Sequence, residues 1–362
     1  MHTLITATWF SKVRMNGELP ADAPVLIVAT HRNGAVDGFL LHALMPRLEF
    51  MLSARLTRTR FQRFFFGGIG VARQKDGGGD NSGALRDCVD HLLAAGQLCI
   101  FPEGTSTLGP RHLPYHSGAA RIALECWERS GICPVIVPVG LHYHDPGSFR
   151  SSVEVVIGEP LHISTPTLGT CRRAIENGLL EVGANFADAG HHELAWLRAR
   201  QEPSVYHGLK RAERAVWFQC RTEWSAIPQK IRNLALRATP ARPDLLPLCL
   251  TPLLLPGMIL HLPVLMTAAL ASRCMADGPN VVALWKILGG TMVALVCCPL
   301  LLIAAGVFTG LPGIFTVTAA TVLLLALWNP VRTAWRNLRY LLAPATARQA
   351  ILQLSRLPLH DV

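Results

Sequence analysis

The chain has 362 residues, of which 50% are hydrophobic and only 16% are charged, with a mean hydropathy of +0.31 and a net charge of +10. This length allows a full-sized core together with a further region, and the composition is too apolar for an ordinary soluble enzyme. The positive charge flanks an apolar block near the C-terminus, a placement that argues against nucleic acid as the partner.

Short apolar runs rich in β-branched residues alternate with helical patterns in the first half of the chain. Apolar residues at helical spacing predict helices over 82–95, 118–129 and 171–200, the last broken near 183–190. The alternation predicts an α/β layer fold. Four runs bounded by Gly or Pro are predicted as strands: 24–29, 97–101, 135–141 and 153–157.

A basic stretch over residues 211–236 carries two tryptophans, Trp217 and Trp224. Basic amphipathic helices with tryptophan are suited to lying along a membrane surface. A helix packed on the α/β region is an equally good interpretation of the same pattern.

An almost uncharged block extends from residue 245 to residue 328. The runs 287–308 and 311–331 are each long enough to cross a bilayer, which needs about 20 residues. Basic flanks on both sides of the block predict that both ends are cytosolic and that the number of crossings is even. We therefore interpret the third run, 245–270, as a re-entrant or kinked hairpin centred on Pro256–Gly257.

Polar motifs follow two of the predicted strands at the point where each strand ends. The first is HRNGAVD at 31–37, and the second is FPEGTS at 101–106. Open α/β sheets place their chemistry at the carboxyl ends of strands, and an imidazole held by a carboxylate can act as a general base. In a continuous helix, His31 and Asp37 would lie on roughly opposite faces. We therefore expect an irregular segment, permitted by Gly34, before a helix begins.

Structural interpretations of the same residues stand beside these. His31 could be a surface residue unrelated to Asp37, and the second motif could be a simple strand-to-helix turn capped by Thr105 or Ser106. Other histidines, such as those at 142 and 144, alternate along a strand and so face the same side. Two ligands without a third make a poor metal site, so no metal site is predicted.

Four blocks, in this order, resemble the glycerolipid acyltransferases, that is, the glycerol-3-phosphate and 1-acylglycerol-3-phosphate acyltransferases. The blocks are HRNGAVD at 31–37, GGIGVAR at 67–73, FPEGTS at 101–106 and VIVPVGL at 135–141. The resemblance is closer to the fungal-type glycerol-3-phosphate or dihydroxyacetone-phosphate acyltransferases and their bacterial relatives. It implies an α/β fold with a central mixed sheet flanked by helices, followed by a C-terminal α-helical membrane region.

The resemblance also implies roles for individual residues. His31 would be the general base, and Asp37 would orient it. Substrate binding would fall to a set drawn from the other three blocks: Arg73 for the acceptor phosphate, with Glu103, Gly104, Thr105, Ser106 and Pro138 shaping the acceptor site. The family usually has an arginine where Ser106 stands, and Arg111, Lys75 or Arg150 could replace it.

The implied activity is transfer of a fatty acyl group from acyl-CoA or acyl-carrier protein to the hydroxyl of a glycerophosphate or lysophospholipid, in phospholipid synthesis. No metal or organic cofactor is implied. The alternatives are a lysophospholipid-remodelling acyltransferase with a non-glycerophosphate head group, and a non-catalytic lipid-binding membrane protein.

The expected organisation is an integral membrane protein with its catalytic domain on the cytosolic face. Its four expected parts are an acyltransferase domain at 1–200, a basic amphipathic linker at 201–243, membrane-embedded helices at 244–331 and a basic cytosolic tail at 332–362.

Overall fold

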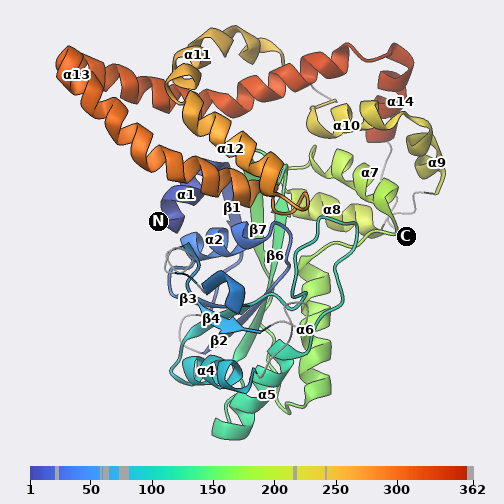
Figure 1. Cartoon of the computed structure of the whole chain (residues 1–362). Coiled ribbons are helices and arrows are strands. Elements are labelled where there is room, and N and C mark those ends of the chain that lie inside the picture. The colour runs from blue at the N-terminus through green and yellow to red at the C-terminus, as the bar shows by residue number, and fades with distance from the viewer. Residues whose placement is uncertain are drawn as a thin grey trace.

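A computed structural model describes residues 1–20, 24–57, 59, 65–72, 81–214, 218–240 and 243–356 (Figure 1). Its centre is a 7-stranded sheet with the order β1-β7-β6-β2-β5-β3-β4. The strands are β1 Phe10–Asn16, β2 Val25–Ala29, β3 Leu48–Ser53, β4 Ile69–Val71, β5 Gln97–Ile100, β6 Val135–Tyr143 and β7 Ser151–Ile157.

The sheet is mixed, because β6 and β7 pair antiparallel while the other neighbours pair parallel. The four strands predicted from sequence are confirmed as β2, β5, β6 and β7. The pattern missed β1, β3 and β4, which lie toward the two edges of the sheet. Edge strands bury less of their surface: most of β1 is exposed and β4 has only three residues, so neither gives a continuous apolar run.

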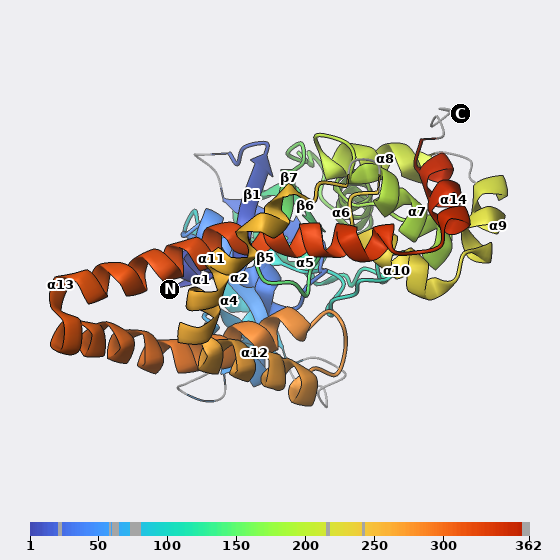
Figure 2. The same cartoon turned by 90° about the horizontal axis from the view of Figure 1, so that it is seen from above.

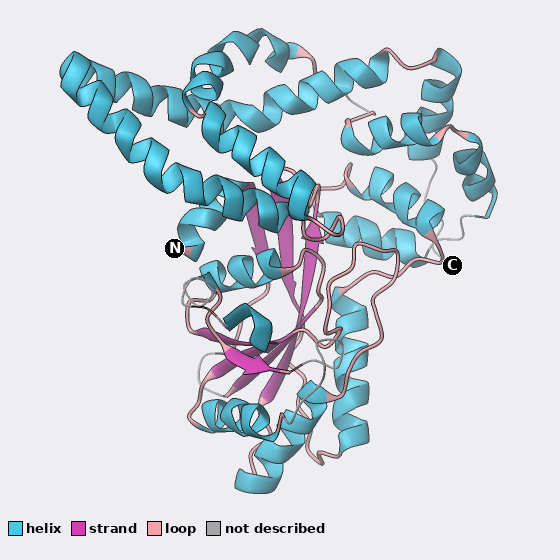
Figure 3. Ribbon diagram, in the orientation of Figure 1, coloured by secondary structure: helices cyan, strands magenta, loops and turns pink. Residues whose placement is uncertain are grey.

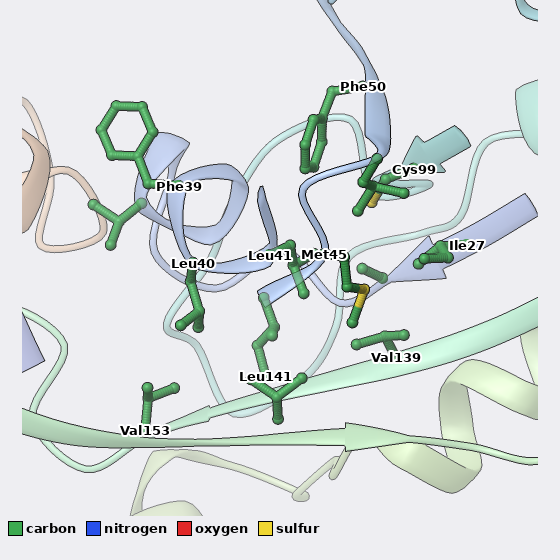
Figure 4. Packing of buried hydrophobic residues seen from close by; sticks show 14 of the residues in the cluster. Ile27, Phe39, Leu40, Leu41, Met45, Phe50, Cys99, Val139, Leu141 and Val153 are labelled. Carbon is green, nitrogen blue, oxygen red and sulfur yellow. The ribbon is translucent and has the colours of Figure 1, made fainter. Parts of the chain in front are cut away.

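Helices cover both faces of the sheet (Figure 3). One face packs on α1 and α2, and Figure 4 shows Leu40 and Leu41 of α2 beside Leu141 of β6. The other face packs on α4, α5 and α6. The helices predicted over 82–95, 118–129 and 171–200 are confirmed, and the last is broken after residue 182 as expected. The helices on the two faces are α1 His2–Trp9, α2 Ala35–Leu44, α4 Ser82–Leu93, α5 Gly118–Ser130 and α6 Leu168–Val182, with the 3-10 turn η1 Ala54–Thr57 between β3 and β4.

A second cluster of helices packs around Trp224, whose side chain is fully buried. The stretch 211–236 is therefore not one surface helix but parts of α8, α9 and α10, and its interpretation as a helical region packed on protein holds for Trp224. Trp217 lies outside the described residues. The cluster comprises α7 Ala189–Ala199, α8 Val205–Arg214, α9 Phe218–Ala226, α10 Gln229–Arg237 and α14 Ala345–Arg356.

The apolar block forms α11 Thr251–Leu260, after the 3-10 turn η3 Leu246–Leu250, then α12 Leu262–Met275 and α13 Val282–Leu341. Figures 1 and 2 show α13 folded back on itself into two arms that extend beyond the sheet. The turn is at Gly310, which has φ +66°. The helices α11 and α12 are bent by 82° at His261, so the proline-rich run is kinked as expected. The position expected for the turn, Pro256–Gly257, is wrong, because both residues lie inside α11.

The arms of α13 expose apolar side chains, among them Phe308 and Phe315. By length and composition, α13 is the one helix among the described residues that could cross a membrane, and α11 with α12 qualifies only as a bent pair. The helix α13 continues through Val331 to Leu341, so the boundary expected at 331 does not coincide with the end of an element.

Candidate active site

The carboxyl ends of three neighbouring strands bring the polar motifs together. The strand β2 lies between β5 and β6, parallel to both. His31 follows β2, Glu103 follows β5 and Tyr143 ends β6. The ends of adjacent parallel strands meet at one edge of a sheet, so residues far apart in sequence form a single site.

His31 and Asp37 are in contact. The His31 Nδ1 and Asp37 Oδ2 atoms are 2.8 Å apart. The contact depends on Gly34, which has φ +59° and directly precedes α2, because this left-handed turn lets the chain fold back before the helix begins. The irregular segment expected between the two residues is therefore observed.

Asp37 is fully buried, and several donors hold its carboxylate. Oδ2 also accepts hydrogen bonds from the backbone N–H groups of Arg32 (2.8 Å) and Asn33 (2.9 Å), while Oδ1 accepts one from the Tyr143 hydroxyl at 2.6 Å. Burial, together with the Asp37 charge, raises the pKa of Tyr143 well above its ordinary value, so the phenol stays protonated and donates. A buried carboxylate with this many donors has a fixed orientation.

The His31 ring is oriented from both sides. It stacks on Phe101 with ring centroids 4.4 Å apart, and its side chain is 15% exposed. Since Nδ1 faces Asp37, its hydrogen goes to the carboxylate, and Nε2 is the nitrogen that can accept a proton. Within the described part of the chain, no side chain or backbone group hydrogen-bonds Nε2.

Glu103 is buried and holds the loops around His31. Oε1 accepts a hydrogen bond from the His31 backbone N–H (2.9 Å) and lies 3.3 Å from His112 Nδ1, while Oε2 accepts from the Leu113 backbone N–H at 2.9 Å. Burial alone would raise the pKa of Glu103, but the contacts with His112 and the two N–H groups outweigh it, and the pKa falls below its ordinary value. Glu103 is therefore an anion that fixes the backbone of the general-base candidate.

The turn after Glu103 contacts the apolar helices. Gly104 has φ +66°, as expected for a sharp turn that needs glycine, and Thr105 follows it in the same turn. The Ser106 Oγ atom accepts a hydrogen bond from Asn280 Nδ2 at 2.6 Å. Asn280 belongs to the loop between α12 and α13. Its backbone carbonyl oxygen packs closely on Gly34, 3.1 Å from the position that a Cβ atom would occupy there. Thus the α12–α13 loop covers both motifs.

Of the other predicted substrate-binding residues, Pro138 lies elsewhere in the domain. Pro138 is buried on β6, and its ring faces Gly178 of α6, on the face of the sheet opposite to α2. Arg73 and Lys75 lie outside the described residues. Arg111 donates to the Phe186 and Ala187 carbonyl oxygens, and Arg150 donates to carbonyl oxygens near the N-terminus.

Sequence reasoning missed three residues that build this site: Arg32, Tyr143 and Asn280. Arg32 lies inside the first motif, and Tyr143 lies two residues beyond the end of the predicted strand, so the sequence held a positional signal for both. Asn280 reaches the site only through loop packing, and no local pattern marks it.

Comparisons with known proteins match the first part of the chain to one family. The family model of the acyltransferases matches residues 11–142. Glycerol-3-phosphate O-acyltransferase 2 of Saccharomyces cerevisiae is 32% identical over 121 residues, which cover 30% of this chain and 16% of the yeast protein. Glycerol-3-phosphate O-acyltransferase 1 of the same yeast is 36% identical over 85 residues, 23% of this chain and 11% of that protein.

A solved structure is similar as well. The crystal structure of the 1-acyl-sn-glycerophosphate (LPA) acyltransferase PlsC from Thermotoga maritima gives a TM-score of 0.36 at 18% identity, covering 49% of this chain and 74% of that one. The chain spans only a small part of the length of the two yeast proteins. The family match and the yeast relatives together confirm the resemblance drawn from the four motifs: residues 11–142 are similar to the acyltransferases, and within them the chain resembles the glycerol-3-phosphate acyltransferases.

Proposed function

We propose that this protein transfers a fatty acyl group from an acyl thioester to the hydroxyl of a glycerophosphate or lysophospholipid, with His31 as the general base and Asp37 as the residue that orients it. The main support for this proposal is the 2.8 Å contact between His31 Nδ1 and Asp37, whose carboxylate is fully buried and accepts several other hydrogen bonds. A surface histidine beside an unrelated helix-terminal carboxylate would not need a buried Asp37 with three further donors.

The reaction follows from this arrangement. His31 Nε2 takes the proton from the acceptor hydroxyl as its oxygen attacks the thioester carbonyl carbon. Asp37 stabilises the imidazolium that forms and keeps its Nδ1–H in place. The tetrahedral intermediate then collapses, the C–S bond breaks, and the imidazolium returns its proton to the thiolate, so that an ester and a free thiol leave the site.

The relatives support the proposed acceptor, and thioester chemistry supports the proposed donors. Two of them are named glycerol-3-phosphate O-acyltransferases, which favours a glycerophosphate acceptor. Acyl-CoA and acyl-carrier protein present the same thioester to the site, so either serves as donor. No step of this acid–base mechanism requires a metal or an organic cofactor, so none is proposed.

Membrane attachment through α13 belongs to the same proposal. Its two arms expose apolar side chains and return to the α/β domain, so both ends of the hairpin lie on the side of the active site. The α12–α13 loop contacts Ser106 directly. A bilayer around the arms would place the active site at the membrane surface, where a lipid-soluble product can leave, and the basic residues beyond the hairpin favour the cytosolic face.

The acceptor can be identified by measuring free CoA released from acyl-CoA by the purified full-length protein in lipid. Glycerol 3-phosphate, 1-acylglycerol 3-phosphate and a lysophospholipid with a larger head group would be compared as acceptors. We expect release only with an acceptor alcohol present, and fastest with one of the two phosphomonoesters. Fastest release with the larger head group would favour the remodelling alternative, and no release with any acceptor would favour a non-catalytic lipid-binding protein.

The orientation of the hairpin can be tested with single cysteines in sealed vesicles, in a variant whose native cysteines have been replaced. Leu311→Cys lies beside the turn of α13, and Asp277→Cys lies in the loop at the active-site side. If the arms cross the bilayer, a membrane-impermeant maleimide labels these two positions from opposite sides. Labelling of both from the same side would contradict a spanning hairpin.

A further inference from the structure

A cavity of about 270 Å³ lies beside the His31–Asp37 pair, between the end of β6 and helix α7. Its wall includes Arg32, which directly follows His31, and Tyr143, whose hydroxyl binds Asp37. It also includes His112, which contacts the same Glu103 that holds the His31 backbone. The cavity is therefore lined by residues that neighbour or hold the catalytic pair, and its volume is just below the range of small-ligand pockets.

Positive charge dominates this cavity. Arg32, Arg200 and Arg237 line it, together with two acids, Asp145 and Glu193. Each acid already has an arginine partner on another element: Asp145 pairs with Arg336 at 2.8 Å, and Glu193 lies 3.6 Å from Arg232. Among the lining residues, the three arginines thus outnumber the two acids, and the nearest charges to Arg32 besides these are the Glu103 and Asp37 carboxylates.

Two of the lining residues each have a buried nitrogen without a hydrogen-bond partner within the described part of the chain. Arg32 donates from Nη2 to the Gly109 carbonyl oxygen at 2.9 Å, but its Nη1 is buried without a partner. His112 Nε2 is likewise buried without one. Arg200 donates to the His144 carbonyl oxygen at 3.3 Å, and burial lowers its pKa to about 10. Buried guanidinium groups with spare donors are costly unless a ligand satisfies them.

We propose that this cavity, here called the arginine pocket, binds a phosphate group of one of the two substrates through Arg32 and Arg200, with Arg237 at its rim. A planar guanidinium donates two parallel hydrogen bonds to phosphate oxygens, which is why arginine suits this task. The pocket would supply the phosphate contact that the family's usual arginine cannot give where Ser106 stands. The phosphate belongs either to the acceptor or to the CoA moiety of the donor.

This inference rests on the proposed function, and its test separates the two. Arg200→Ala and Arg200→Lys would be compared with wild type in steady-state acyl transfer by the full-length protein, with Arg173→Ala on the exposed side of α6 as a matched control. We expect Arg200→Ala to raise one KM at least about tenfold while kcat changes less, and Arg200→Lys to recover part of the loss. An increase in the KM of the acceptor identifies the acceptor phosphate, and an increase in the KM of acyl-CoA identifies the CoA phosphates.

Binding can also be measured without turnover. In a His31→Ala background, calorimetry would follow inorganic phosphate binding to the full-length chain before and after adding Arg200→Ala. We expect the second substitution to weaken binding at least about tenfold. If Arg200→Ala fails to fold, Arg237→Ala at the exposed rim replaces it, with a smaller expected increase of about threefold.

Unchanged phosphate binding, together with both KM values within about twofold of wild type, would overturn the arginine pocket and leave the proposed function intact. Acyl transfer that survives His31→Ala would instead overturn the mechanism, whatever the pocket binds.

Discussion

The edge of the sheet around His31 and the α13 hairpin differ in which side chains they bury. At the sheet edge, charged groups are buried and each carboxylate is held by several donors, as Asp37 and Glu103 show. In the hairpin, apolar side chains are exposed, as Phe308 and Phe315 show. The first region depends on specific geometry, and the second depends on the surrounding medium. Single substitutions should therefore have large effects at the sheet edge and small effects in the hairpin.

The sharpest test of specific geometry is Asp37→Asn. The amide keeps the shape of the side chain but removes the charge that stabilises the imidazolium, so we expect kcat to fall by about 10³-fold. Steady-state CoA release measures the loss in kcat, and a circular dichroism spectrum shows that the variant is folded. Asp90→Asn, at an exposed pair with Arg129, is the control and should leave kcat unchanged. A fall in kcat of less than about tenfold in Asp37→Asn would contradict the large effect expected at the sheet edge.

Glu103→Gln should reduce stability as well as activity. In wild type, the His31 and Leu113 N–H groups donate to the two carboxylate oxygens of Glu103. In the variant, one of these N–H groups would face an amide NH2 group, so we expect the free energy of unfolding at neutral pH to fall by about 2 kcal/mol. Chemical denaturation of wild type and variant in detergent measures this difference.

The pH dependence of Glu103 has a definite sign. Because folding lowers its pKa from the ordinary 4.5, its stabilising contribution is complete above that value and is lost as the pH falls through the lower folded value. Wild type should therefore lose its advantage over Glu103→Gln in acid. An advantage that grows as the pH falls would contradict the assignment of Glu103 as a buried anion.

Asn280→Ala tests the contact between the two regions. Loss of the 2.6 Å hydrogen bond to Ser106 frees the turn after Glu103, so we expect kcat/KM to fall between about threefold and tenfold. Asn233→Ala on exposed α10 is the matched control. If Asn280→Ala behaves like that control, the α12–α13 loop does not contribute to the site.

The smallest effect on catalysis is expected from Phe308→Ser combined with Phe315→Ser. These exposed side chains lie far from the site along α13, so kcat in detergent should change by less than about twofold. Attachment to lipid should weaken, because each aromatic side chain contributes about 2 kcal/mol when it leaves water. Vesicle flotation measures this, with Phe308→Leu as the control. Unchanged flotation would remove the hairpin from membrane attachment.

Local patterns predicted part of this molecule well. The apolar runs of β2, β5, β6 and β7, the turn at Gly34 and the pairing of His31 with Asp37 follow from short-range spacing and from the resemblance it supports. Tyr143 and Asn280 join the site across long sequence separations, and only packing brings them there. Trp224 shows the same limit, because an amphipathic basic stretch does not reveal whether protein or lipid covers its apolar side.

The most direct measurement is the rate of acyl transfer by His31→Ala beside wild type, each in lipid with acyl-CoA and glycerol 3-phosphate. Without its general base the protein should lose at least about 10²-fold in kcat, while thermal unfolding stays close to wild type because the ring is partly exposed. A His31→Ala protein that releases CoA at the wild-type rate would contradict the central claim.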